Sequence, residues 1–226
     1  MGAFVFYASA GDDPVRAGLE VRGLLHWIFA ASLIAAQFWM SASMGQVGLI
    51  RIGSVVFLGL LPLVLCYWPL GIDWSDLGFG RPQNLLKISR VFFLVALVSP
   101  VLILIGMKMS GSSSYYGKIF SDEDSHFDRL RDLGSFVLVS TLLLEFFFRS
   151  FLFMGHRRFS KARPWFRASL IVAGEMIVHL KKPMEEIAGV GVLSTILCWM
   201  THRTQSVWPA VVLHLWIEVW FVLSFF

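Results

Sequence analysis

Charged side chains are scarce in this sequence. Only 15% of its 226 residues are Asp, Glu, Lys or Arg, and 57% are hydrophobic, whereas soluble globular domains are roughly 45–50% apolar. The shortage excludes a soluble globular chain, because the few charges cluster between long apolar runs. The net charge of +4 does not indicate nucleic-acid binding, since the basic residues lie in short loops, as the positive-inside rule expects. We therefore predict an all-α, polytopic transmembrane helix bundle with the lipid bilayer as its surroundings.

Cysteine is also scarce. The two cysteines, Cys66 and Cys198, both lie inside apolar runs. Their separation excludes a disulfide framework and the short cysteine spacing of zinc sites. The chain has no internal repeat either, so a repeat architecture is not expected.

Seven apolar runs are candidates for membrane spans, since a spanning helix needs about 20 predominantly apolar residues. The segment 108–132 is predicted to be an exposed loop, and the basic loop 155–164 to be cytoplasmic, together with the N-terminus and the loop 71–89. We expect a multi-pass protein of a bacterial inner membrane. The predicted spans cover about 23–44, 47–70, 90–107, 133–154, 165–180, 185–200 and 206–226.

The fourth span carries two charges near its centre, Glu145 and Arg149. Each such side chain costs roughly 2.5–3.5 kcal/mol at mid-bilayer on an insertion scale. Their i, i+4 spacing places them on one helix face, where they can pair. Lipid cannot satisfy this face, so it is expected to turn towards protein or a water-filled cavity.

Three further polar side chains interrupt the apolar runs. His179 ends the fifth span, and His214 and Glu218 lie four residues apart in the seventh. A carboxylate can take a proton from water, and an imidazole can hold the water or an oxyanion. With Glu145 and Arg149, these residues predict a hydrolytic site without a covalent intermediate. At 1.5 Å per residue, Glu145 and His214 come to the same depth, and His179 lies roughly 9 Å nearer the outer face.

The order of these motifs resembles the CAAX protease and bacteriocin-processing (CPBP) family of glutamic-type intramembrane proteases. The resemblance rests on Glu145-Phe-Phe-Phe-Arg149, then His179, then Ser206-Val-Trp208-Pro209 with His214 and a polar residue four positions later, and on the loop 74–82. It covers about 74–226 as a CAAX-protease-like helical core, behind a head and two helices in 1–73. The resemblance implies a glutamate-activated water, a membrane-associated peptide or protein substrate, and the site residues Glu145, Arg149, His179, His214 and Glu218.

Three positions depart from the family pattern. The first motif is commonly Glu-Glu-x-x-x-Arg, in which the first Glu usually activates the water, and Leu144 stands there. The second motif usually has an aromatic residue four positions before its His, where this chain has Glu175. The third usually ends in Asn or Asp, where this chain has Glu218. Either Glu145 and one of these neighbouring acids do the chemistry, or the activity is lost.

Structural interpretations of the same residues stay open. Glu145 and Arg149 would then be an ion pair that locks two helices, His214 and Glu218 an interhelical hydrogen bond, and His179 an interfacial residue. We expect two other histidines, His26 and His202, at the membrane interface, and the phenylalanines 146–148 to face lipid or to pack.

Two classes of function therefore remain. The first is an intramembrane endopeptidase that needs no cofactor, with a divalent metal on the histidines and Glu145 as its variant. The second is a catalytically inactive member that acts as a structural or scaffold subunit of a larger membrane protein complex. Within that class, buried histidines are able to ligate haem or pigment.

Overall fold

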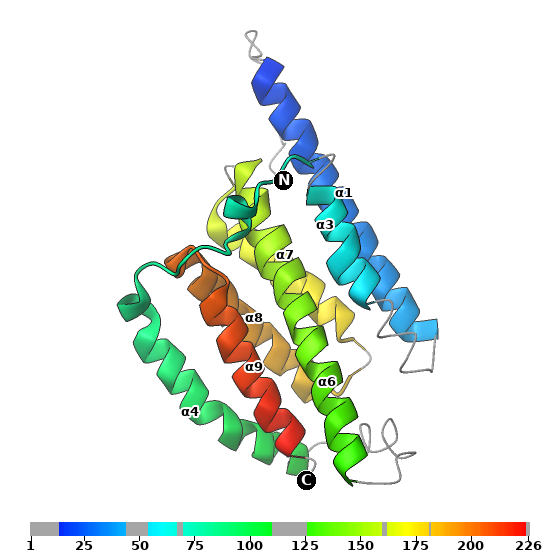
Figure 1. Cartoon of the computed structure of the whole chain (residues 1–226), viewed down its shortest axis with the longest axis vertical. Coiled ribbons are helices and arrows are strands. Elements are labelled where there is room, and N and C mark those ends of the chain that lie inside the picture. Colours follow the sequence, from blue (N-terminus) through cyan, green and yellow to red (C-terminus); the bar gives the residue numbers. More distant parts are fainter. Residues whose placement is uncertain are drawn as a thin grey trace, which may run out of the picture.

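The structure is a computed structural model, and it describes residues 14–43, 54–66, 70–109, 126–159, 162–180 and 182–224. Every regular element in these residues is a helix, which confirms the all-α prediction (Figure 1). Residues 1–13 of the predicted head, 1–22, and residues 110–125 of the predicted exposed loop lie outside the described part of the chain.

Seven helical segments follow the seven predicted spans (Figure 1). They are α1 (Pro14–Ser43), η1 with α3 (Val55–Leu60 and Leu61–Leu65), α4 (Leu85–Met109), α6 with η4 (His126–Glu145 and Phe146–Met154), α7 (Pro164–Val178), α8 (Met184–Thr204) and α9 (Trp208–Leu223). Two short 3-10 turns, η3 (Trp74–Leu77) and η5 (Gly155–Arg158), complete the described elements. The helix α6 begins at His126, before the predicted apolar span, because the polar residues that precede this span are also helical.

Four of the described helical stretches are long and apolar enough to cross a membrane: 18–39, 85–108, 137–158 and 184–204. Stretches 55–65 and 208–223 are shorter apolar helices. The chain is an integral membrane protein with a helical bundle. At 15 residues, α7 is about 22 Å long, shorter than the roughly 30 Å hydrocarbon core.

Local sequence signals explain where the C-terminal helices begin. Pro164 starts α7, and Pro209 lies in the first turn of α9, where the missing N–H costs nothing. Glu185 and Glu186 lie in the first turn of α8, where carboxylates oppose the helix dipole favourably. The helix α8 ends at Thr204, and the next residue, Gln205, turns the chain into α9 with a φ of 52°.

The π-helical segment η4 is the centre of the packing. All its side chains from Phe147 to Met154 are buried. The segment contacts η1, η3, α7 and α8, and its apolar side chains share one cluster with residues of α1 and of the loop 70–79. Phe147 and Phe148 therefore pack inside the bundle and do not face lipid, and Phe146 stacks on Phe79 at 6.2 Å between ring centroids. In contrast, α4 lies on the outside of the bundle and contacts α8 and α9 (Figure 1).

One end of the bundle is joined by polar contacts between loops. Arg158 Nη1 lies 3.1 Å from Asp73 Oδ2 and 2.9 Å from Asp76 Oδ2. The loop 78–80 also accepts a hydrogen bond from the residue that precedes α9. The backbone N–H of Val207 donates to Gly78 O at 3.0 Å. These contacts place the loops around 75, 157 and 206 at the same end, as the predicted topology requires.

The expected interfacial position of His26 is wrong. Its side chain is fully buried against Phe151 of η4, with ring centroids 4.4 Å apart. His26 Nδ1 lies 3.0 Å from His156 Nδ1, and Trp27 Nε1 donates to His156 Nε2 at 2.8 Å. The physical reason is that each histidine finds a hydrogen-bond partner, which allows burial. His202 is half-buried near the end of α8, edge-on to Phe153 at 6.5 Å.

Candidate active site

The site begins where the helix changes its winding. Glu145 is the last residue of α6, and Arg149 lies in the π-helical segment that follows. Both side chains are 0% exposed. Such π-helical insertions are frequent at functional sites, and this one re-aims the side chains that follow Glu145.

His214 of α9 is the closest partner of Glu145. Its Nδ1 lies 2.7 Å from Glu145 Oε1, a short hydrogen bond that links two helices separated by 69 positions in the sequence. Arg149 Nη1 is 3.6 Å from the same oxygen. The predicted Glu145–Arg149 pair is therefore present, but its geometry is looser than that of the bond to His214.

The closest partner of Arg149 is Glu175, on α7. Arg149 Nη1 lies 2.9 Å from Glu175 Oε1 and 2.8 Å from Glu175 Oε2, and Glu175 is 2% exposed. The predicted set of site residues does not include Glu175, which the sequence analysis named only as a neighbouring acid that could share the chemistry. It is a charge in an apolar span, four residues before His179. That charge was the available signal.

His179 follows α7 directly and is 8% exposed, so it is buried and not interfacial. Its Nδ1 lies 2.8 Å from the backbone carbonyl oxygen of Glu175. A carbonyl oxygen only accepts hydrogen bonds, so Nδ1 carries a proton and donates it. In the neutral ring, Nε2 is then an acceptor.

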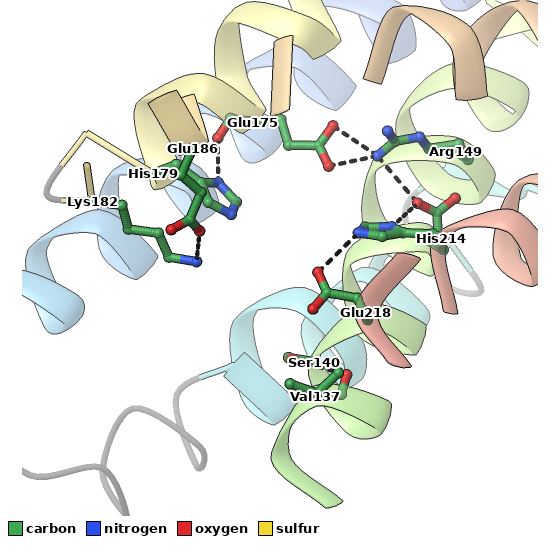
Figure 2. A network of polar contacts seen from close by, with 10 residues as sticks. Val137, Ser140, Arg149, Glu175, His179, Lys182, Glu186, His214 and Glu218 are labelled. Atoms are coloured by element: carbon green, nitrogen blue, oxygen red, sulfur yellow. Dashed lines mark hydrogen bonds and ion pairs between the residues drawn. The ribbon is translucent and has the colours of Figure 1, made fainter. Parts of the chain in front are cut away.

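Glu218 lies on the other side of His214. Its Oε1 is 3.5 Å from His214 Nε2, and its side chain is 27% exposed. His214 thus lies between two carboxylates, and with both ionised its ring carries a proton on each nitrogen. Figure 2 shows Arg149, Glu175, His214 and Glu218 converging, with His179 on the α7 side of the network.

The structure therefore brings the five predicted site residues and Glu175 into one region from α6–η4, α7 and α9. Contacts run from Glu175 through Arg149, Glu145 and His214 to Glu218. His179 is bonded to the backbone carbonyl of Glu175, four residues earlier in the chain. The catalytic roles of these residues stay predictions.

Several buried polar atoms have no hydrogen-bond partner within the described part of the chain. They include Glu145 Oε2 and both Nε and Nη2 of Arg149. Buried polar groups in folded proteins are nearly always hydrogen-bonded, to protein or to water. These atoms are the ones that a water molecule or a substrate would contact.

A metal is the other group considered for this site. Across the described residues, no group of three or more His, Cys, Asp or Glu side chains has the geometry to hold an ion. The 2.7 Å bond from Glu145 to His214 Nδ1 also occupies Glu145 Oε1 and His214 Nδ1 with a shared proton. We assign no step of the chemistry to a metal.

Residues 129–220 match the model of the family described as Rce1-like, Type II CAAX prenyl endopeptidase Rce1-like. The predicted family resemblance is confirmed. The match spans less than half of the chain but includes all six polar residues of the network, while α1, α3, α4 and the loop 74–82 lie outside it. The family is one of proteases, so at this level the comparison indicates an intramembrane CAAX-type endopeptidase. Neither the curated proteins nor the solved structures gave a match.

Proposed function

We propose that this protein is an intramembrane endopeptidase that hydrolyses a peptide bond with Glu145 as the general base. The observation that carries the proposal is the environment of Glu145. Its carboxylate is fully buried, bonded to His214 through one oxygen, and free of protein partners in the described residues at the other. It also lies within the segment that matches a protease family.

The geometry supports the following reaction. Glu145 Oε2 accepts a proton from a water molecule while the water oxygen bonds to the scissile carbonyl carbon, whose oxygen becomes the oxyanion. His179, protonated at Nδ1, accepts a hydrogen bond at Nε2 and orients the water. His214 keeps its Nδ1 bond to Glu145 and donates to the developing negative charge from Nε2, whose contact with Glu218 is longer, at 3.5 Å. The C–N bond then breaks, and the proton held by Glu145 passes to the leaving nitrogen.

The substrate class follows from the location of the site and from the family. The catalytic groups lie among membrane helices, so the scissile bond has to reach membrane depth. A lipid-modified peptide is suited to this, because a prenyl group partitions into the bilayer. We propose a membrane-associated peptide with a prenylated CAAX terminus, processed in a bacterial inner membrane.

A second function is supported by a different observation. Leu144 occupies the position of the glutamate that usually activates water in this family, and Arg149 is tied to Glu175. Both features fit a catalytically inactive subunit whose buried ion pairs hold a larger membrane complex together. Ligation of haem or pigment belongs to this second proposal, and the visible absorbance of the purified protein tests it.

The test is cleavage of a farnesylated CAAX peptide by the protein in proteoliposomes. Glu145→Gln should lower the rate about 10²–10⁴-fold, because a positioned base is lost. His214→Ala should lower it about 10²–10³-fold. Glu185→Gln is the matched control, because Glu185 is exposed and outside the site. A folded Glu145→Gln protein that cleaves at the wild-type rate would overturn the proposal, and inhibition by chelators would favour the metal variant.

A further inference from the structure

Glu175 is a buried carboxylate in an apolar helix, and it pairs with the guanidinium of Arg149, which the sequence analysis paired with Glu145. Arg149 Nη1 lies within 2.9 Å of both Glu175 oxygens but 3.6 Å from Glu145 Oε1. Arg149 therefore has an interhelical partner, from α7, that is closer than the partner on its own helical segment.

The two carboxylates compete for one cation. Arg149 and Glu145 are four residues apart, a spacing that brings side chains together directly. A carboxylate has about four lone-pair sites. If Arg149 N–H groups moved within hydrogen-bonding distance of Glu145, they would fill sites with which Glu145 has to accept the proton of a reacting water. Glu175 prevents this by holding Arg149 on the α7 side.

We propose that Glu175 is a positioning residue: it holds Arg149 back from Glu145, so that Glu145 keeps His214 as its closest partner and one oxygen for the water. The inference rests on the proposed function, in which Glu145 is the base. The backbone carbonyl of Glu175 also fixes the proton of His179 on Nδ1. One residue thus orients groups on both sides of the reacting water, without touching the water itself.

If Glu175 has this role, two departures from the family pattern, Leu144 and Glu175, are connected. Leu144 removes a carboxylate from α6 next to Glu145, and Glu175 adds one on α7 where an aromatic residue is usual. The carboxylate count near Arg149 is therefore kept, with the second group supplied by another helix. Leu144 alone, with an aromatic residue at position 175, would leave Arg149 with Glu145 as its single buried carboxylate neighbour among the described residues.

The first test measures which carboxylate is coupled to Arg149 and does not depend on activity. Thermal unfolding in detergent is compared for Arg149→Ala, Glu175→Gln, Glu145→Gln and the two double variants that contain Arg149→Ala. Arg149→Ala should lower the Tm by roughly 6–20 °C. The loss should shrink more in the Glu175→Gln background than in the Glu145→Gln background. Equal or greater coupling to Glu145 would overturn the inference.

The second test is kinetic, on the farnesylated CAAX peptide in proteoliposomes. Glu175→Gln should lower kcat about 10²-fold, because the base is misplaced, and should leave KM unchanged. Adding Leu144→Glu to Glu175→Gln should raise kcat at least tenfold, whereas a merely structural role predicts no recovery. The rise should disappear when Glu145→Gln is added as well, since a base supplied by the new glutamate itself would keep it. If Glu175→Gln does not fold, Glu175→Asp, which withdraws the carboxylate by one methylene, makes the same comparison.

The outcomes separate this inference from the proposed function. Wild-type kcat for Glu175→Gln, with Glu145→Gln inactive, would overturn the positioning role and leave the protease proposal standing. Equal rates for wild type and Glu145→Gln would overturn the protease proposal, and with it the catalytic meaning of Glu175. The unfolding measurements would still decide whether Glu175 is the partner of Arg149. Glu185→Gln, at an exposed site, controls for the loss of a carboxylate.

Discussion

Arg149 shows how one buried charge determines what its neighbours are able to do. Its guanidinium is 0% exposed and lies between carboxylates of two different helices. A buried charge of this kind is tolerated only when it is paired. The cost of removing a partner therefore measures how completely the site excludes water.

Arg149→Ala should reduce the stability of the protein by roughly 3–5 kcal/mol, because two buried carboxylates lose their cation. Glu145→Gln should cost less, since the amide keeps a hydrogen-bonding shape and Arg149 keeps Glu175. Chemical unfolding in detergent measures both free energies. Identical unfolding curves for wild type and Arg149→Ala would show that the ion pair is not buried.

Which polar residues meet inside the bundle could be predicted from the sequence, because each charge within an apolar run carries a cost that only function or pairing offsets. The partner of Arg149 could not. That choice depends on how α7 packs between α1 and η4, where space is short at Gly174: a Cβ there would lie 2.9 Å from Ile34 Cδ1 of α1 and 3.5 Å from Phe148 Cε1 of η4. The hydropathy pattern of the sequence does not report such a packing distance.

At the scale of elements, the seven spans could be read from apolar length alone. The π-helical winding from Phe146 could not, since an almost uniformly apolar run has no periodicity that reveals a change of register. That winding sets which side chains of η4 meet α7 and α8. It is therefore the local feature that separates the predicted helix from the observed site.

The loop before α4 is tied to the start of α9 at one glycine. Gly78 has a φ of 76°, and a Cβ there would lie 3.1 Å from Met154 Cγ and 3.3 Å from Val207 Cγ1. Gly78→Ala should therefore reduce stability by roughly 1–3 kcal/mol, through the strained backbone. Gly80→Ala is the control, because nothing lies within 4 Å of its Cβ position. Equal melting temperatures for the two variants would contradict this account.

The contact of α1 with η5 depends on a chain of hydrogen bonds that sequence analysis missed. Trp27 Nε1 donates to His156 Nε2, so the proton of neutral His156 lies on Nδ1 and is donated to His26. Trp27→Phe should cost about 1–3 kcal/mol, because a buried acceptor loses its donor. Trp165→Phe, at a side chain that is 63% exposed, should cost much less. Thermal unfolding compares the two, and equal losses would argue against the hydrogen-bond chain.

At the scale of the whole molecule, the helices alternate in direction, so that loops near residues 75, 157 and 206 share one end and residue 185 lies at the other (Figure 1). The first end carries Arg157, Arg158 and Arg203. Short loops rich in arginine and lysine stay on the cytoplasmic side. This end should therefore be cytoplasmic.

Single cysteines test this orientation, because the native Cys66 and Cys198 are 2% and 0% exposed and should stay unlabelled. Ser75 and Glu185 are exposed in the structure and lie at opposite ends of the bundle. In intact cells, a membrane-impermeant thiol reagent should label Glu185→Cys, and it should label Ser75→Cys only after the membrane is opened. Labelling of both variants in intact cells would refute the seven-helix arrangement, whereas labelling of Ser75→Cys alone would invert it. An inverted bundle would also change where a substrate has to enter, since the basic end that η5 and the loop 71–84 form would then face outward.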